Sequence, residues 1–293
     1  MKSKVTAGKE NGFEKLSRLI FIMATATSIV SLVFILYFIF SRAIPTILEI
    51  GPVEFLTGTK WKPNATNPKF GILPMIVGST YATLGSVLLG VPIGIMASVF
   101  MAFYAPKPLY KYLKGGINLL AGIPSVVYGL FALTLVVPWV RQISGKTGQS
   151  LFAAIIVLMI MILPTLISLS EAALRAVPAS YYEGAVGLGA SKERAILNVV
   201  LPAAKSGVLS SVIMGTGRAI GETMAVAMVA GNQAIMPKDI FLGVRTLTTN
   251  IVLEMSYAGQ FHSNALIATG AVLFFFILLI NIVFNFVRGK RVN

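Results

Sequence analysis

Long apolar windows without charged residues alternate with short polar segments along the whole chain. Each of five uncharged windows is long enough to cross a hydrocarbon core, which takes about 20 residues of helix. A sixth window, residues 208–231, is interrupted only by Arg218 and Glu222. This pattern predicts an all-α integral membrane protein with six transmembrane helices. The five uncharged windows are residues 19–41, 70–106, 115–140, 147–170 and 255–287.

Composition agrees with this pattern. Hydrophobic residues make up 56% of the chain and charged residues only 12%, against roughly 25% charged residues in soluble domains. The first window follows a basic stretch, as the apolar core of a signal peptide would. It is longer than the about 7–15 residues of such a core and no small-residue cleavage site follows it, so we expect a retained helix. The chain has no cysteine, which excludes disulfides and thiol chemistry.

The distribution of lysine and arginine predicts the orientation. With the N-terminus inside, fifteen basic residues fall in cytoplasmic segments and eight in outer ones, as the positive-inside rule requires. We therefore expect cytoplasmic tails at 1–18 and 288–293 around a transmembrane domain at 19–287, with a cytoplasmic connection at 171–207. The net charge of +14 then reflects topology and contact with anionic membrane lipid. Nucleic-acid binding is not expected, because the basic residues are scattered along helix flanks and do not cluster with aromatic residues.

The connection at 171–207 carries the signals of two successive short helices. Ser180 with Glu183 three residues later fits a capping box, and Gly189 is placed to end the first helix in the left-handed conformation. Ser191 then caps a second helix, which stops near Pro202. The pattern predicts a helix, a glycine turn and a helix beneath the membrane.

Residues 183–202 resemble the EAA loop of ABC importer permeases, whose pattern is E-A-A-x3-G-x9-I-x-L-P. Gly184 replaces the first Ala of that pattern and Val199 the Ile. The literal "EAA" at 171–173 does not fit, because Val177 stands where the glycine belongs. The alternative is an amphipathic hairpin that lies on the bilayer. The resemblance implies that a partner ATPase docks on Glu183, Gly184, Ala185, Gly189, Leu201 and Pro202.

Two further stretches, "LAGIPSVVYGL" at 120–130 and "GRAIGETMAV" at 217–226, resemble the phosphate-specific branch of these permeases. The second stretch is closer to PstC-type subunits than to PstA-type subunits, and the similarity covers roughly residues 71–287. The resemblance implies the MetI-like fold of type I ABC importers in the bacterial cytoplasmic (inner) membrane. It also implies a second, PstA-like permease subunit, a dimer of ATP-binding subunits and an extracytoplasmic phosphate-binding protein. This chain has no phosphate-binding loop motif, so it is not expected to be an enzyme or to bind a cofactor; ATP and Mg are expected on the partner ATPase.

Arg218 and Glu222 stand one helical turn apart inside the sixth window. Arg218 would lie about 15 Å along a helix that starts near Val208, close to the bilayer midplane. Two unpaired charges there would cost about 5–7 kcal/mol, so we expect the two side chains to pair on one helix face. That face would carry Ser211 and Asn232 along a polar path. Given the resemblance, Arg218 is expected to contact phosphate. Glu222 is expected to compete for Arg218, so that the anion is released. The alternative is that the pair only fixes the packing of the helices as a static lock.

Other residues are weaker candidates. Ser125 and Tyr128 share a helix face and are candidates for lining the path, against plain packing. Pro124 is expected to kink the third span. Gly90-x3-Gly94 and Gly217-x3-Gly221 fit close helix contacts. His262 is the only histidine, with no carboxylate or cysteine cluster near it in the sequence, so no metal site is expected.

Two other functional classes remain open. An ion-coupled secondary anion transporter would need intramembrane carboxylates, and Glu222 is the only one predicted; inverted repeats with broken helices are not evident either. An intramembrane enzyme would need a nucleophile with a base, and the predicted spans contain no suitable histidine or aspartate. Dependence of uptake on ATP would separate an ABC importer from an ion-coupled transporter.

Overall fold

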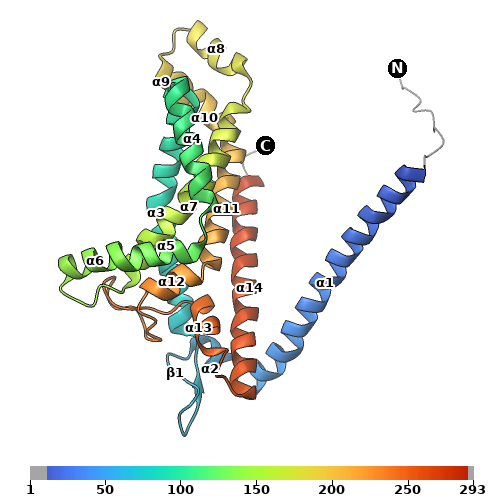
Figure 1. Cartoon of the computed structure of the whole chain (residues 1–293), viewed down its shortest axis with the longest axis vertical. Coiled ribbons are helices and arrows are strands. Elements are labelled where there is room, and N and C mark those ends of the chain that lie inside the picture. The colour runs from blue at the N-terminus through green and yellow to red at the C-terminus, as the bar shows by residue number, and fades with distance from the viewer. Residues whose placement is uncertain (1–11, 290–293) are drawn as a thin grey trace.

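A computed structural model describes residues 12–289, which form helices joined by loops together with one two-stranded hairpin (Figure 1). In the hairpin, Trp61 pairs with Phe70 and Lys62 with Lys69 in antiparallel register. The elements are α1 (Gly12–Ile50), α2 (Pro52–Thr57), β1 (Trp61–Lys62), β2 (Lys69–Phe70), α3 (Leu73–Val99), the π-helical turn η1 (Phe100–Tyr104), α4 (Lys107–Gly122), α5 (Ser125–Phe131), η2 (Ala132–Val136), α6 (Val137–Ser144), α7 (Leu151–Arg175), α8 (Ala179–Gly187), α9 (Lys192–Ala195), η3 (Ile196–Val200), α10 (Leu201–Ala203), α11 (Lys205–Gly221), α12 (Met224–Val229), α13 (Leu247–Glu254) and α14 (Gln260–Gly289).

Five helical segments are long and apolar enough to cross a membrane, and a sixth is added if the bent pair of α9–α10 and α11 counts as one span. Four of the predicted windows correspond to the long helices α1, α3, α7 and α14. The bent pair changes direction by 70° between Ala203 and Lys205. The chain is therefore an all-α membrane protein with five or six candidate spans.

The third predicted span, 115–140, is wrong as a single helix. α4 ends at Gly122, and Ile123 and Pro124 are extended (ψ 128° and 142°) before α5 starts at Ser125. Proline disfavours helical geometry in the residue before it, which explains a break at this point where only a kink was expected. Figure 1 shows α4 running along the bundle and α5 to α6 running across it.

The helix predicted for 208–231 is also broken. α11 ends at Gly221, Glu222 is extended (ψ 130°), and α12 begins at Met224. The single helix face that was expected to join Ser211 to Asn232 therefore does not exist.

Glycines bring α3, α7 and α11 into close contact. A Cβ atom on Gly94 would lie 2.9 Å from the Cβ of Leu166, and one on Gly90 would lie 2.9 Å from Cδ1 of Ile162. The predicted packing role of Gly90 and Gly94 is confirmed. Gly217 and Gly221 have open space where a Cβ would stand, so this pair makes no close contact with the rest of the described chain.

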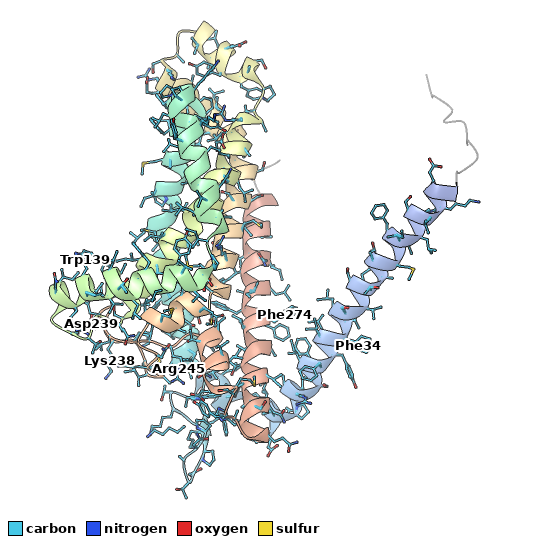
Figure 2. The ribbon with its side chains drawn as sticks, viewed as in Figure 1. Phe34, Trp139, Lys238, Asp239, Arg245 and Phe274 are labelled. Carbon is cyan, nitrogen blue, oxygen red and sulfur yellow. The ribbon has the colours of Figure 1, made fainter. Side chains whose placement is uncertain are left out.

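Among the described residues, the long helix α1 packs against the bundle near its C-terminal end. Phe40 meets Phe274 and Phe275 of α14 with ring centroids 6.0 and 5.6 Å apart. From there α1 diverges from α14, as the positions of Phe34 and Phe274 show (Figure 2). None of its most apolar window is buried within the chain. The beginning of α1, the end of α14 and α8 lie toward one end of the molecule, and the hairpin lies at the other (Figure 1).

Candidate translocation site

Arg218 and Glu222 do not form the expected ion pair. Arg218 lies in the last turn of α11, partly buried, and its Nη1 donates only a long hydrogen bond of 3.4 Å to Thr165 Oγ1 of α7. The Oε1 atom of Glu222 accepts from the backbone N–H of Ala225 at 3.1 Å and so caps α12. Pairing at i,i+4 requires a continuous helix, and the helix ends between the two residues.

This arrangement leaves Arg218 with unused binding capacity. A guanidinium has five N–H donors, and within residues 12–289 only the bond to Thr165 engages one of them. An unneutralised guanidinium within an apolar span costs about 2.5–3.5 kcal/mol on insertion scales. Its fork of donors fits an oxyanion. The geometry therefore favours an anion contact at Arg218.

The two candidates on α5 differ in their surroundings. Tyr128 is 7% exposed, and its hydroxyl donates to the carbonyl of Leu120 at 2.8 Å, which ties α5 to α4 across their break. Ser125 is partly buried at the first position of α5. Next to Tyr128, a Cβ on Gly129 would lie 2.9 Å from the Cα of Ala225, so α5 and α12 pack closely.

Ser211 and Asn232 lie apart from the proposed anion contact. Ser211 is fully buried between α11 and α7, with its Oγ 2.6 Å from that of Ser170. The place of Ser211 along a path therefore stays a prediction. Asn232 lies beyond α12 with a left-handed backbone (φ 52°), and its Nδ2 donates to the carbonyl of Ala227 at 2.6 Å.

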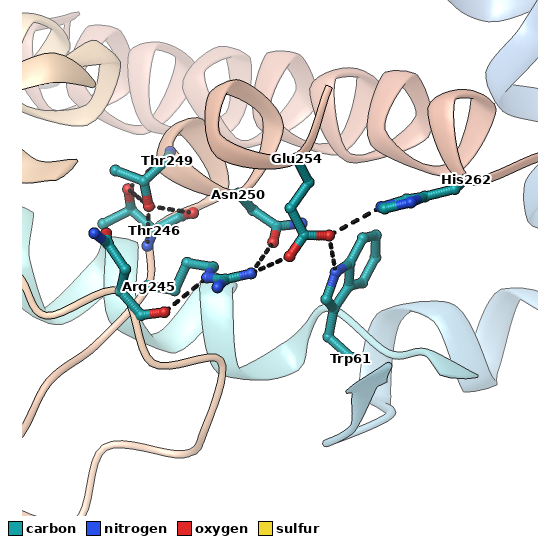
Figure 3. Close-up of polar contacts among 8 residues, drawn as sticks. Trp61, Arg245, Thr246, Thr249, Asn250, Glu254 and His262 are labelled. Carbon is teal, nitrogen blue, oxygen red and sulfur yellow. Dashed lines mark hydrogen bonds and ion pairs between the residues drawn. The ribbon is translucent and has the colours of Figure 1, made fainter. Parts of the chain in front are cut away.

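A cluster that the sequence did not reveal surrounds Glu254 beside the hairpin (Figure 3). It consists of Trp61, Arg245, Asn250, Glu254 and His262. Glu254 is 5% exposed, and its Oε2 accepts from Trp61 Nε1 at 2.7 Å and lies 2.9 Å from His262 Nε2, while its Oε1 pairs with Arg245. His262 thus lies beside a single carboxylate, Glu254, which the spacing along the sequence did not indicate. Trp61 is 193 residues from Glu254, so no local pattern could have joined them.

A second cluster surrounds Glu171, the glutamate of the literal "EAA". Glu171 lies in α7, is 2% exposed, and accepts from Tyr110 at 2.9 Å and from Lys114 and Arg175. Arg175 also donates to the carbonyl of Met101 at 2.9 Å, in η1 directly after α3. These bonds join η1, α4 and α7, which agrees with the exclusion of 171–173 from the loop motif.

The predicted coupling loop forms two helices around a glycine turn. Gly189 has φ +89°, and the N–H groups of Gly189 and Ala190 donate to the carbonyls of Val186 and Ala185, as in a Schellman motif. Ser191 caps α9 by accepting from the N–H of Arg194 at 3.4 Å. The predicted capping box of Ser180 is wrong, because Pro178 is the N-cap residue and Ser180 lies within α8.

The loop presents an exposed tip. Leu188 is 93% exposed, and there is open space around Gly184 and Gly189. At its base, Tyr182 stacks on Phe103 with centroids 6.5 Å apart, and Lys192 donates to the carbonyl of Phe103 at 2.8 Å. Of the other predicted docking residues, Glu183 and Pro202 are exposed, and Ala185 and Leu201 are partly buried.

Within residues 12–289 no group of three or more histidine or acidic residues could hold a metal ion. The charged clusters are explained by ion pairs and hydrogen bonds within the chain.

The structure is thus a bundle of long apolar helices with an exposed loop of two short helices at one end. Residues 90–290 match the family model of the binding-protein-dependent transport system inner membrane component. The chain belongs to this family, the multi-pass inner-membrane permeases of ABC importers, which are not themselves enzymes.

Relatives and solved structures agree with this family. The chain is 44% identical over 238 residues to the probable ABC transporter permease protein YqgH of Bacillus subtilis, covering 79% of this chain and 77% of the relative. It is 32% identical over 248 residues to the phosphate transport system permease protein PstC of Mesorhizobium japonicum, covering 78% and 75%.

The fold resembles a bacterial ABC transporter that imports the acidic polysaccharide alginate, with a TM-score of 0.68 at 14% identity over 95% of this chain and 98% of that one. It also resembles the inward-facing MetNI methionine transporter, with a TM-score of 0.61 at 21% identity over 75% and 95%.

Proposed function

We propose that this chain is the PstC-like permease subunit of an ATP-driven phosphate importer. Several relatives at about 30% identity over most of the chain are phosphate transport system permeases, and Arg218 offers free guanidinium donors within a span. The observation that carries the proposal is that this single cation is not neutralised within the described chain. The alternative of an ion-coupled secondary transporter is not favoured by the family, although broken helices of the kind found in such transporters are present.

The proposed topology has six spans with both termini in the cytoplasm. The tails 1–18 and 288–293 and the coupling loop 171–207 then share the cytoplasmic side. The start of α1, the end of α14 and α8 lie toward one end of the molecule, which supports this topology (Figure 1). Residues 1–11 and 290–293 of these tails lie outside the described residues. The hairpin with Lys60, Lys62 and Lys69 would face the outside, where the phosphate-binding protein delivers its anion.

The proposed complex contains a PstA-like second permease subunit and a dimer of ATP-binding subunits that holds ATP and Mg; this chain binds no cofactor. The exposed tip around Leu188 suits docking of the ATPase, because an apolar side chain with 93% exposure gains most from burial. The proposed docking residues are Glu183, Gly184, Ala185, Gly189, Leu201 and Pro202.

Arg218 would bind phosphate during its passage. The break after Gly221 keeps Glu222 on the cap of α12 in this conformation, so the anion would meet Arg218 without competition. If Glu222 returns toward Arg218 in another conformation, it displaces the anion, since a bound phosphate and a carboxylate repel each other. Tyr128, Ser125 and Asn232 would line parts of the path, and Ser211 would do so only after a rearrangement.

The test is uptake of radiolabelled phosphate into proteoliposomes that hold the complete importer with ATP inside. We expect ATP-dependent uptake in competition with unlabelled phosphate and not with sulfate. The matched pair of variants is Arg218→Gln, which should lower uptake by about a hundredfold, and Arg141→Gln, which changes an exposed arginine on α6 and should leave uptake intact. Uptake driven by an ion gradient without ATP would refute the proposal.

Docking of the ATPase has its own test. Gly189→Asp places a side chain at φ +89°, where strain costs about 1–3 kcal/mol. Uptake should fall while the permease still reaches the membrane, and Gly187→Asp, at an exposed glycine without a positive φ, should be milder. Full transport and normal capture of the ATPase by the Gly189→Asp variant would exclude this docking site.

A further inference from the structure

The helix predicted for 208–231 is broken into α11 and α12. Its second half, α12, is held at both ends by the segment around α13. Before α12, the carbonyl of Glu222 accepts from Thr248 Oγ1 at 3.0 Å. Beyond α12, the carbonyl of Asn232 accepts from Arg245 Nε at 2.9 Å. The position of α12 therefore depends on residues 245–248.

That segment is held in turn by α3 and by Glu254. The N–H of Leu247 donates to Ser79 Oγ at 2.9 Å, and a Cβ on Gly78 would lie 2.5 Å from the carbonyl oxygen of Arg245. At the far end of α13, Glu254 reaches back to pair with Arg245 and also accepts from Trp61 of the hairpin. One buried carboxylate thus connects both ends of α13 with the hairpin (Figure 3).

The first half of the same broken helix, α11, packs against a different part of α7 from α12. Gly215 of α11 lies against Leu166, and Ser211 bonds to Ser170, whereas Val226 and Val229 of α12 belong to one buried cluster with residues near the start of α7. The extended residue Glu222 lies between the two halves. Such a junction at the end of a helix can absorb a change in backbone angles, as hinges do.

We propose that Glu254 is a positioning residue for transport, which sets the place of α12 and Glu222 relative to Arg218 through Arg245, α13 and Thr248. This inference rests on the proposed function of Arg218. Movement of the hairpin at Trp61, on the outer side, would reach the level of Arg218 along this chain of hydrogen bonds. Glu254 itself does not touch the transported anion.

The first test is a double-mutant cycle on the maximal rate of phosphate uptake by the complete importer. Thr248→Val removes the hydroxyl that holds Glu222, and Glu254→Gln removes the charge that holds Arg245. Each should lower the rate about two- to tenfold, as for the loss of one hydrogen bond. Because both act on one chain of contacts, the double variant should be no slower than the worse single variant. A double variant whose uptake rate falls by the product of the two single effects would overturn the proposal.

Matched controls are available within the chain. Thr269→Val removes a buried hydroxyl of α14 that bonds only to the carbonyl of Ala265, and it should leave the rate unchanged. If Glu254→Gln fails to reach the membrane, Trp61→Phe replaces it, because this variant keeps an aromatic ring and loses the N–H bonded to Glu254. Its control is Trp139→Phe, at the other tryptophan, which lies exposed on α6.

The second test measures position without transport. The chain has no cysteine, so spin labels at Tyr81→Cys on α3 and Val252→Cys on α13, both 50% exposed, report one distance. Trp61→Phe should shift or broaden the distance distribution, and Trp139→Phe should not. An unchanged distribution in Trp61→Phe would overturn the positioning role. Failure of the Arg218 assignment would show only in uptake, so the two failures are distinguishable.

Discussion

Glu254, bonded to Trp61 of the hairpin, and Glu171, in the last turns of α7, are both buried, and each accepts hydrogen bonds from three side chains. Arg218 and Glu222 lie on either side of the break between α11 and α12. The side chain of Arg218 makes one long hydrogen bond, and that of Glu222 caps α12. The two buried carboxylates are paired with cations within the described chain, whereas Arg218 and Glu222 are not. Because an unpaired charge in a span lowers stability, its presence favours a functional role over a packing role.

The largest expected effect lies at the centre. Arg218→Gln should lower phosphate uptake by about a hundredfold, since it removes a charged hydrogen-bond donor worth about 1.5–3 kcal/mol from a desolvated site. Stability should hardly change, because Arg218 contributes one hydrogen bond of 3.4 Å. Uptake is measured at equal membrane levels, and thermal unfolding of the purified subunit supplies the stability. Near-normal uptake would place Arg218 among the structural charges.

A change in the cluster around Glu254 should lower folding stability strongly, unlike the change at Arg218. Glu254→Ala leaves Arg245, whose side chain is 17% exposed, as a buried charge without its partner, which costs about 3–5 kcal/mol of folding stability. Thermal unfolding in detergent should show a strongly lowered transition temperature. Glu54→Ala, whose carboxylate is 54% exposed beside Lys69, is the control and should change stability very little. Equal transition temperatures for the two variants would contradict this account.

The cluster around Glu171 allows the stability contributed by two buried carboxylates to be compared. Glu171→Ala should cost less than Glu254→Ala, about 1–3 kcal/mol, because the side chains of Lys114 and Arg175 are 30% and 45% exposed and can be hydrated. The same unfolding measurement ranks the two variants. A larger loss for Glu171→Ala would show that hydration of the two cations does not compensate for the lost carboxylate.

The smallest effect on stability is expected for Glu222→Gln. The amide oxygen of glutamine can still accept from Ala225, so the change should stay within about 0.5 kcal/mol. Uptake should slow if Glu222 assists release of the anion, and the double variant Arg218→Gln/Glu222→Gln should remain inactive. Recovery of uptake in the double variant would indicate that the two residues pair in the functional state and act as a lock.

The helical class, four of the long helices and the coupling loop were predictable because their signals are local. An uncharged apolar run must form a helix to satisfy its backbone groups within a bilayer. The positive φ of Gly189 and the cap at Ser191 follow from neighbouring residues. Ser180 was misassigned because Pro178, two residues earlier, starts the helix.

The breaks and clusters were decided by tertiary structure. The sequence pattern placed Glu222 within a continuous helix. In the structure its carbonyl accepts a hydrogen bond from Thr248, 26 residues later, and this bond replaces the helical one that is lost where α11 ends. Glu254 depends on Trp61, which follows the first span. The sequence by itself determined which segments enter the membrane and that Arg218 and Glu222 lie among them. Only the tertiary structure decided which buried charges are neutralised, because that depends on contacts between segments far apart in the chain.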